Sequence, residues 1–329
     1  MTSQAQIEVI QGGLQATVQD YPGRQGMLRQ GFFPSGAMDY LALQAANLLV
    51  GNPLSAAGIE IALGNFALRF GDEHVIAACG ADAPLTIDSE PAALWESHRV
   101  GAGSELKLGI CPGPGFRIYL AISGGIGVPE LFGSRATYTM GALGGHEGRA
   151  LKVGDRLPIG SPDGEGRLAR FKQSARPRYG REWEIEAVAG PQAAPDYLTG
   201  EDVREFFGRS WAVDRNSDRT GIRLEPFKFR WARASGGVAG GHPSNILDNP
   251  YPVGAVNING DLPVILGPDG PTAGGFIVAA TVAHAALWKI GQLRPVGDRL
   301  RFREVTVGEA AELERRQREL LTGASIETA

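Results

Sequence analysis

Short apolar runs, separated at close intervals by glycine and proline, are the feature that most constrains the fold. The 329 residues include 47 glycines and 21 prolines, which follow no fixed period. Runs such as 74–79 (HVIAAC) and 105–110 (ELKLGI) have the length of single strands, and turn residues bound them. The segment 111–116 (CPGPGF) cannot continue a helix, because proline removes a backbone donor and glycine weakens helices. The sequence therefore predicts a mainly β protein with a few helices.

Three segments have helical patterns. Asp39 stands where an N-cap belongs, the apolar residues after it fall on one face, and Gly51 ends the segment. We expect a second helix within 282–295, after the strand-like GGFIVAATV. A third is expected over 308–321, where the high charge predicts a peripheral or assembly helix.

A short echo recurs along the chain. The pentapeptide V-G-D-R-L begins at Val153 and again at Val296, and the related VGAGSEL begins at Val100. One interpretation is a turn that feeds a strand, used repeatedly in a β-rich fold. The other is a duplicated barrel whose closing strands share a turn. Matches this short arise readily by chance, so they support duplication only weakly.

The length favours about two domains. Residues 161–182 are polar and basic with few large apolar side chains, which is typical of a linker. We therefore predict a first domain over 1–160, a linker over 161–182, a second domain over 183–305 and a C-terminal helix and tail over 306–329.

Composition excludes several classes of partner. The formal net charge of -4, without a basic stripe, argues against binding to nucleic acid. The longest apolar window, 276–288, is too short to span a bilayer, and the N-terminus lacks a signal-peptide pattern. Two cysteines, Cys79 and Cys111, do not require a disulfide. We expect a cytoplasmic protein that binds neither membrane nor nucleic acid.

The signatures of several catalytic machineries are missing. There is no G-x-S-x-G elbow and no G-x-x-x-x-G-K-[ST] phosphate loop, and the five histidines lack metal-ligand spacing. We predict neither metal nor nucleotide on this chain. What remains is a set of Asn, Asp, Arg and Gln clusters in Gly/Pro-rich loops, densest over 244–275. Such clusters suit a reaction in which the protein positions groups while a cofactor supplies the reactive atom.

Four long segments resemble the allophanate hydrolase subunit 2-like family, in one order along most of the chain. The family includes the carboxyltransferase region of biotin-dependent urea carboxylase, KipA-type regulators and a subunit of bacterial 5-oxoprolinase. The four segments are 17–52 (TVQDYPGRQGMLRQGFFPSGAMDYLALQAANLLVGN), 119–139 (YLAISGGIGVPELFGSRATYT), 217–225 (SDRTGIRLE) and 274–302 (GGFIVAATVAHAALWKIGQLRPVGDRLRF).

Within the family, the stretch 244–276 resembles the urea carboxylase branch. The oxoprolinase and KipA branches have a shorter pattern, from which this chain departs at 257–259, at DGP and at Phe276, where tyrosine is expected. The segment LWKIGQLRP again resembles urea carboxylase. A relative that acts on guanidine is an open alternative.

The resemblance implies a fold of two linked, cyclophilin-like β-barrel domains and a carboxyl-transfer reaction. Carboxybiotin on a separate carrier protein would release CO2 in a dry site, and a urea nitrogen would capture it to give allophanate. The implied partners are a subunit 1-like carboxyltransferase chain, a biotin carboxylase and the biotin carrier protein. The chain would be only part of the enzyme and inactive without these partners.

Candidate site residues follow from this chemistry, because Asn offers both donor and acceptor to urea and Asp accepts from its NH2 groups. Asn245, Asp248 and Asp269 are the catalytic candidates, although turn formation around NP and GPDGP explains them nearly as well. The substrate-binding candidates are Asn249, Asn257, Lys289 and Arg294. Asp20, Arg24 and Asp39 carry the opening motif of the family.

Some polar residues of these segments also have plain structural interpretations. Lys289 and Arg294 would either steer an anionic carboxybiotin or stabilise a helix C-terminus. In NINGD, a hairpin turn is favoured for Asn259 and Asp261. Two rival functions remain, namely a subunit of 5-oxoprolinase and a non-catalytic KipA-like regulatory subunit.

Overall fold

The computed structural model describes residues 6–162 and 168–329. The chain divides into two compact units. Unit 1 comprises Met1–Tyr179 together with Arg318–Ala329, and unit 2 comprises Gly180–Gln317. The predicted domain boundaries stay a prediction, and residues 163–167 of the predicted linker lie outside the described residues.

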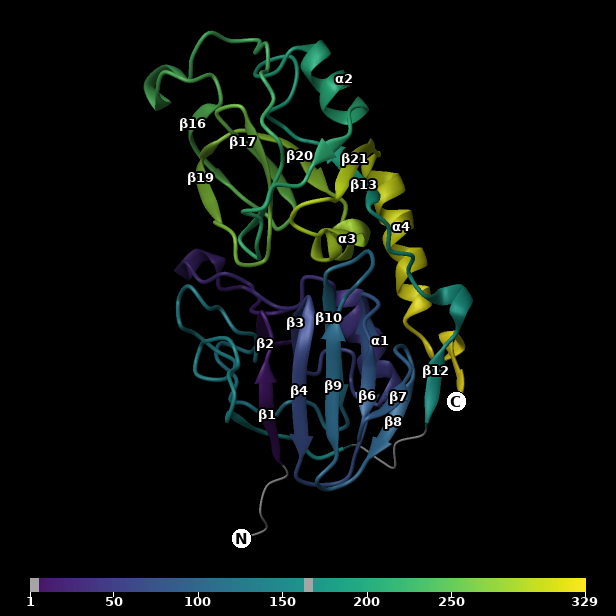
Figure 1. The fold of residues 1–329 in the computed structure, drawn as a ribbon. Helices are drawn as coiled ribbons and strands as arrows, with labels where there is room; N and C mark the ends of the chain where they lie inside the picture. Colours follow the sequence, from purple (N-terminus) through teal and green to yellow (C-terminus); the bar gives the residue numbers. More distant parts are fainter. Residues whose placement is uncertain (1–5, 163–167) are drawn as a thin grey trace. The chain divides into compact units, whose positions relative to one another are not determined.

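Unit 1 is built from two main antiparallel sheets (Figure 1). One has the strand order β11-β1-β4-β9-β6-β7 and the other the order β2-β3-β10-β5-β8, while β12 and β22 form a separate pair. The bounds are β1 Gln6–Gly12, β2 Gln15–Gln19, β3 Gly58–Ala62, β4 Gly64–Phe70, β5 His74–Gly80, β6 Leu85–Ile87, β7 Glu90–Ala92, β8 Ser97–Val100, β9 Glu105–Ile110, β10 Arg117–Ile122, β11 Arg156–Pro158, β12 Ala169–Phe171 and β22 Ile326–Thr328.

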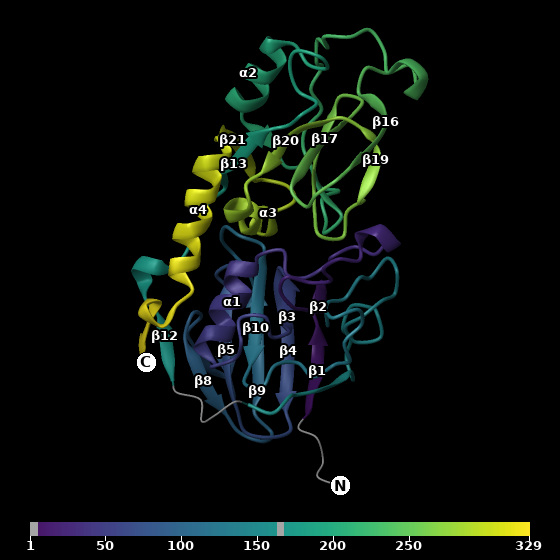
Figure 2. The ribbon, with the colours of Figure 1, turned by 180° about the vertical axis from the view of Figure 1, so that it is seen from behind.

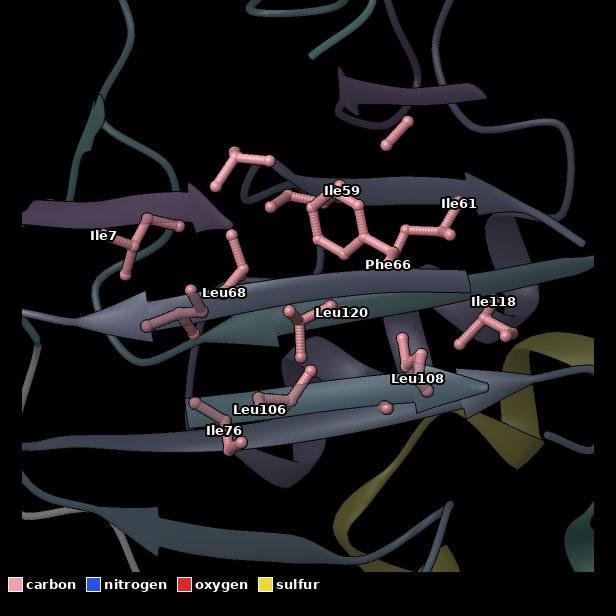
Figure 3. Close-up of a cluster of buried hydrophobic side chains, with 14 of the residues drawn as sticks. Ile7, Ile59, Ile61, Phe66, Leu68, Ile76, Leu106, Leu108, Ile118 and Leu120 are labelled. Atoms are coloured by element: carbon pink, nitrogen blue, oxygen red, sulfur yellow. The ribbon is translucent and has the colours of Figure 1, made fainter. Parts of the chain in front are cut away.

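The core of unit 1 lies between these two sheets. Figure 3 shows Phe66 and Leu108 from one sheet among side chains of Ile59 and Leu120 from the other. Strand β9 alternates buried and exposed residues, as expected for a strand with one solvent-facing side. Strands β5 and β10 are buried on both faces, which explains why their sequences read as continuous apolar runs.

Helix α1, Tyr40–Leu49, covers the second face of β5 and β10 (Figure 2). Its N-cap is Asp39, whose carboxylate accepts a 2.9 Å hydrogen bond from the amide of Ala42. The capping satisfies a backbone donor that has no partner within the first helical turn. The predicted helix and the predicted cap are both confirmed.

Unit 2 contains a seven-stranded sheet in the order β14-β21-β13-β20-β17-β18-β15 and a two-stranded ribbon of β16 and β19 (Figure 1). Strands β13 and β21 run parallel, and the other neighbours are antiparallel. The bounds are β13 Glu182–Ala189, β14 Trp211–Ala212, β15 Gly221–Arg223, β16 Asn245–Pro250, β17 Ala255–Asn259, β18 Leu262–Leu266, β19 Ala273–Phe276, β20 Val278–Val282 and β21 Arg299–Glu304.

Three α-helices follow in this part of the chain: α2 Gly200–Gly208, α3 Leu287–Gln292 and α4 Val307–Leu320. Helices α3 and α4 confirm the second and third predicted helices. Helix α2 was not predicted. It begins with a capping box in which Thr199 and Asp202 bond each other's backbone amides. Its Phe206 stacks on Phe302 of β21 with ring centroids 4.8 Å apart.

Several sequence expectations can be compared with this fold. The mainly β class is confirmed, and all the predicted strand runs coincide with strands. All three copies of the V-G echo are turns that feed a strand, β9, β11 and β21 in chain order. Residues 259–262 form the predicted hairpin turn between β17 and β18. Within the described residues, the helices are all too short or too polar to cross a bilayer.

Candidate functional site

The stretch richest in asparagine and aspartate folds into the β16–β19 ribbon of unit 2 (Figure 1). Asn245 lies opposite Phe276, and Asn249 lies opposite Gly274. Three residues of β16 therefore face a single residue of β19, which makes a bulge. The bulge leaves Leu247 and Asp248 exposed. A bulge re-aims side chains that regular pairing would place on alternate faces.

Tyr251, directly after β16, joins the ribbon at its hydroxyl group. The hydroxyl accepts a 2.7 Å hydrogen bond from the Phe276 amide and donates a 2.8 Å bond to the Phe276 carbonyl. The ring packs against β19 where Gly274 stands, and a Cβ there would lie 2.8 Å from a ring carbon. Burial raises the pKa of Tyr251, so its hydroxyl keeps its proton at neutral pH.

Asn257 of β17 lies near this hydroxyl and is 6% exposed. Its side-chain amide favours the charged form of Tyr251, which opposes the rise that burial causes in the pKa of the tyrosine. The Oδ1 atom of Asn257 is buried and has no hydrogen-bond partner among the described residues. Leaving a buried polar atom unpaired costs about 1–3 kcal/mol. A ligand that donates an N–H or O–H group would satisfy this oxygen.

Two further predicted residues lie beside Tyr251. Asp248 is close enough for its charge to contribute to the raised pKa of Tyr251. Asn249 accepts a 3.2 Å hydrogen bond at Oδ1 from Gln192, whose own carbonyl oxygen accepts from the Val278 amide at 2.9 Å. The structure thus brings Asp248, Asn249 and Asn257 together around Tyr251.

Part of the turn interpretation also holds for this segment. The Asp248 carboxylate accepts from the amide of Asn249 at 2.9 Å, and the Asn249 side chain donates to the Pro250 carbonyl at 3.1 Å. These are local bonds of the kind that Asn and Asp form in turns. They leave the second carboxylate oxygen of the exposed Asp248 for another donor.

Asn245 lies at the other end of β16. Its amide donates to the His242 carbonyl at 3.1 Å, and its carbonyl accepts from Arg233 at 2.5 Å. Ser244 next to it is fully buried, and its hydroxyl accepts from the Gly260 amide at 3.1 Å. Asn245 is therefore held by its main chain, while its pairing with Phe276 connects it to the Tyr251 hydroxyl.

Asp269 forms a buried ion pair with Arg219. The guanidinium donates at 2.7 and 3.1 Å to the two carboxylate oxygens, and both residues are about 5% exposed. Asp269 also lies in a turn closed by a bond from the Gly270 amide to the Gly267 carbonyl. Both carboxylate oxygens are engaged, so this residue supports the loop between β18 and β19.

Lys289 and Arg294 make their contacts around α3. The Lys289 ammonium bonds the Glu184 carbonyl at 2.8 Å and the Glu186 carboxylate at 2.6 Å, both on β13. The amide of Arg294 donates to Asp298 at 3.0 Å. The charge of Lys289 is thus balanced by Glu186. The steering role predicted for these two cations stays a prediction.

The three motif residues lie in unit 1 and bind its loops. Asp20 accepts from the Ser134 hydroxyl at 2.8 Å and from the Arg135 amide at 2.6 Å. Burial raises the pKa of Asp20, although these bonds oppose the rise. The buried Arg24 donates to the Ala136 carbonyl. Asp39 caps α1, so these contacts are structural ones within unit 1.

A metal centre has no candidate in the part of the chain that the structure describes, since three or more His, Cys, Asp or Glu side chains do not converge there. The donor set of the β16–β19 region consists of amide, carboxylate and phenol groups. That set suits hydrogen bonding to a small polar molecule.

The model of the carboxyltransferase domain, subdomain A and B, matches residues 30–304 of this sequence. The chain belongs to the carboxyltransferase domain family. The matched range contains the whole β16–β19 region and begins after Asp20 and Arg24. The predicted family resemblance is confirmed.

The chain is 41% identical to the urea amidolyase of Lachancea kluyveri, over 98% of this chain and 18% of that protein. It is 32% identical to a 5-oxoprolinase subunit of Escherichia coli, over 92% of this chain and 93% of that protein. The crystal structure of the Kluyveromyces lactis urea carboxylase superposes with a TM-score of 0.93 at 39% identity, over 100% of this chain and 30% of that chain. The chain thus spans less than a third of the length of the urea amidolyase and of the urea carboxylase.

Three residues of the candidate site escaped the sequence prediction. Tyr251 stands inside the stretch that drew attention, between two prolines, but its buried hydroxyl bonds depend on β19. Gln192 and Arg219 lie far from that stretch in sequence and reach it only through the sheet. The segment SDRTGIRLE, which contains Arg219, was the one available signal.

Proposed function

We propose that this chain is a carboxyltransferase component of a biotin-dependent urea carboxylase, moving a carboxyl group from carboxybiotin to a urea nitrogen to give allophanate. Guanidine is the related substrate that the same site would accept. The observation that carries the proposal is the buried Oδ1 atom of Asn257, which has no donor within the described residues. The identity to a urea amidolyase and the likeness to a urea carboxylase support it.

Urea fits this arrangement chemically. It is small, planar and neutral, with four N–H donors in one plane. One N–H would donate to Asn257 Oδ1, which would relieve the cost of the unpaired oxygen. A site with a fixed acceptor rejects analogues that lack the donor far better than an apolar pocket does. In this proposal the exposed Asp248 accepts the proton that the attacking nitrogen loses, as a general base.

The biotin cofactor also fits the donor and acceptor set. Its ureido ring keeps an N–H group that could donate to Asn257 or Asp248, and bound biotin would supply the carboxyl group. Asn245 and Asn249, as predicted, would orient either molecule, biotin or urea, through their side-chain amides. Asp269 would act through Arg219 by holding the β18–β19 loop in place.

The proposal includes partner chains, because this chain spans only 18% of the urea amidolyase it matches. A subunit 1-like carboxyltransferase chain, a biotin carboxylase and a biotin carrier protein would complete the enzyme in the cytoplasm. We expect the chain to be inactive without them.

One observation favours a second candidate function, a subunit of 5-oxoprolinase. The match to the 5-oxoprolinase protein of Escherichia coli extends over 93% of that relative, so the two chains have similar extents. The lactam of 5-oxoproline also offers an N–H donor to Asn257. The identity is lower, at 32% against 41% for the urea amidolyase.

A reconstituted assembly would decide between these candidates. The purified chain is combined with its subunit 1-like partner, a biotin carboxylase and the carrier, and ATP hydrolysis is followed after adding urea, guanidine or 5-oxoproline. Stimulation by urea or guanidine that requires this chain supports the proposal. Stimulation by 5-oxoproline without any biotin component supports the second candidate. A lack of stimulation by all three, with every component present, favours a regulatory binding role.

Variants assign the site within that assembly. Asn257→Ala should lower kcat/KM for urea by about 10- to 100-fold, since one buried hydrogen bond to substrate is lost. Asn245→Ala and Asp248→Ala should abolish urea-dependent turnover with the fold intact. The matched control is Asn259→Ala, two residues along the same strand and exposed at the hairpin. Wild-type rates in all three site variants would contradict the assignment.

A further inference from the structure

We propose that Gln192 is a positioning residue that locks the side-chain amide of Asn249, so that this amide offers an N–H donor to the carbonyl oxygen of urea. The site would then recognise its ligand through a carbonyl group as well as through N–H groups. This inference rests on the proposed function, since it names a residue that sets how that site receives its substrate. Gln192 would act only through Asn249.

The orientation of the Gln192 amide follows from a main-chain partner. The amide of Val278 donates to Gln192 Oε1 at 2.9 Å. Because a main-chain N–H can only donate, the atom that faces it must be the oxygen of the side-chain amide. The NH2 group of Gln192 donates to Asn249 Oδ1 at 3.2 Å. The Val278 amide thus fixes which end of Gln192 is oxygen and which is nitrogen, a choice that a side-chain amide without such a partner leaves open.

The Asn249 amide is oriented from both of its ends. Because Gln192 presents an NH2 group, Asn249 must meet it with Oδ1. The other end agrees, since the NH2 group of Asn249 donates to the Pro250 carbonyl at 3.1 Å, and a carbonyl can only accept. An NH2 group has two N–H donors, and the second one has no acceptor among the described residues. This second N–H is the donor that we assign to the ligand.

The anchor of Gln192 lies beside the other half of the candidate site. Val278 is the strand partner of Asn257, at a point where the pairing of β17 with β20 shifts register. Gly190 lets the chain before Gln192 approach β20 closely, because a Cβ there would lie 2.2 Å from the Val278 carbonyl oxygen. The donor of Asn249 and the acceptor of Asn257 are therefore tied to the same residue of β20. Urea, with a carbonyl and N–H groups in one plane, matches such a pair.

The substitution Gln192→Glu separates the two bonds of this side chain. A carboxylate oxygen still accepts from the Val278 amide, so the loop keeps its anchor, whereas the donor to Asn249 is lost. Two oxygens would then face each other, and Asn249 would turn its amide by 180° to give NH2 to the carboxylate. The carbonyl oxygen of urea would meet Oδ1 in place of a donor. We expect KM for urea to rise about tenfold with kcat changed by less than about twofold, because the groups that transfer the carboxyl are untouched.

A double-mutant cycle in the reconstituted enzyme tests whether Gln192 acts through Asn249. Gln192→Glu, Asn249→Ala and the double variant are compared by KM and kcat for urea. If Gln192 works by orienting the amide, Gln192→Glu raises KM in the wild-type background and has no further effect in the Asn249→Ala background. Equal effects in both backgrounds, or a wild-type KM in Gln192→Glu, would overturn the proposal. Gln192→Met, which is neutral and of similar length, should raise KM in the same direction and would exclude the introduced charge as the cause.

A second readout does not depend on activity. In the purified full chain, the side-chain NH2 resonances of Asn249 are identified by their loss in Asn249→Ala and followed by ¹⁵N NMR. Gln192→Glu should shift these resonances, because the amide turns and gains a charged acceptor, while those of the exposed Asn259 stay in place. Unchanged Asn249 resonances would overturn the proposal. If urea fails to stimulate even the wild-type assembly, the proposed function fails, and the NMR comparison still decides whether Gln192 orients Asn249.

Discussion

The pentapeptide V-G-D-R-L occurs once in each unit, and its aspartate has opposite pKa behaviour in the two places. In unit 1, Asp155 accepts from two guanidinium nitrogens of Arg149 at 2.6 and 2.9 Å, which holds the pKa of this carboxyl at about 2. In unit 2, burial raises the pKa of Asp298, whose partners include the Trp183 indole at 2.9 Å and the Arg294 amide at 3.0 Å.

The difference shows which property belongs to the pentapeptide and which to its surroundings. Both copies form a turn that leads into a strand, and both aspartates accept from a main-chain amide a few residues earlier in the chain. A nearby guanidinium favours the charged form of Asp155. The guanidinium of Arg181 lies 3.5 Å from Asp298 and is 46% exposed, so it favours the charged form there less strongly. Neutral donors hold the Asp298 carboxylate without offsetting the loss of water.

The largest effect is expected when the fully buried aspartate is removed. Asp298→Ala removes the carboxylate that accepts from the Trp183 indole and the Arg294 amide, and each buried hydrogen bond lost in this way costs about 1–3 kcal/mol. We expect a loss of about 3 kcal/mol in the free energy of unfolding, measured by denaturant titration of the full chain. Asp298→Asn, which keeps an acceptor oxygen, should lose much less. An alanine variant as stable as the wild type would contradict this account of unit 2.

The second effect concerns the pH dependence of stability. The pKa of Asp155 is lowered from 3.8 to about 2 in the folded chain. Its contribution to the free energy of unfolding is therefore fully present above about pH 3.8 and is lost as the pH falls through about 2. Asp155→Asn should lower the free energy of unfolding by about 2 kcal/mol at pH 7. Solvent reduces this value, because the Arg149 side chain is 29% exposed and its charge is partly screened.

Asp298→Asn is the matched control for that experiment, because its sign is opposite. The folded-state pKa of Asp298 is raised, so its contribution is present below the unfolded pKa and lost as the pH rises through the folded pKa. The stability difference between wild type and variant should therefore grow with pH for Asp155 and shrink with pH for Asp298. Parallel pH profiles for the two variants would break the comparison.

A third, smaller effect separates the two guanidinium groups. Arg149→Gln should raise the pKa of Asp155 toward its ordinary value, by about 1 or more, because the bidentate partner is lost. Arg181→Gln should change the pKa of Asp298 less, since Arg181 lies 3.5 Å away and is largely solvated. Carboxyl ¹³C titration of the two aspartates measures both. An equal change in the pKa of the two aspartates would mean that Arg181 stabilises the charged form of Asp298 as strongly as Arg149 stabilises that of Asp155.

The smallest effect should be the same in both units. Gly154 and Gly297 have φ of +90° and +98°, where an L side chain is strained. A Cβ at Gly154 meets nothing within 4 Å, and one at Gly297 meets only the end of Arg181 at 3.5 Å. Gly154→Ala and Gly297→Ala should each cost about 1 kcal/mol in unfolding free energy. Clearly unequal costs would show that the turn is not a purely local property.

Much of the fold was predictable because it depends on neighbouring residues. The continuous runs of β5 and β10 and the alternating run of β9 were recognisable as strands, and Asp39 was recognisable as the cap of α1. Helix α2 was missed because it is short and mostly polar. The available signal was Thr199 followed three residues later by Asp202, a capping box with aspartate in place of glutamate.

The candidate site was predictable only in part. Asp248, Asn249 and Asn257 fall in one stretch of sequence, so their density of polar groups drew attention to them. The place of Tyr251 among them could not be predicted, because its hydroxyl bonds Phe276, which follows 25 residues later. Gln192 is 57 residues from Asn249. Pairings over such distances depend on strand register, and a turn pattern carries no information about it.

The sequence by itself determined the local elements: strand runs, capped helices and the two V-G-D-R-L turns. These depend on backbone preferences and on side chains a few residues apart. Only the tertiary structure decided which polar groups are satisfied, because the partners of Asp155, Asp298, Asp269 and Asn257 are set by packing. Burial removes water from each group, and the charges and donors that happen to surround it then fix its pKa or leave an oxygen for a ligand.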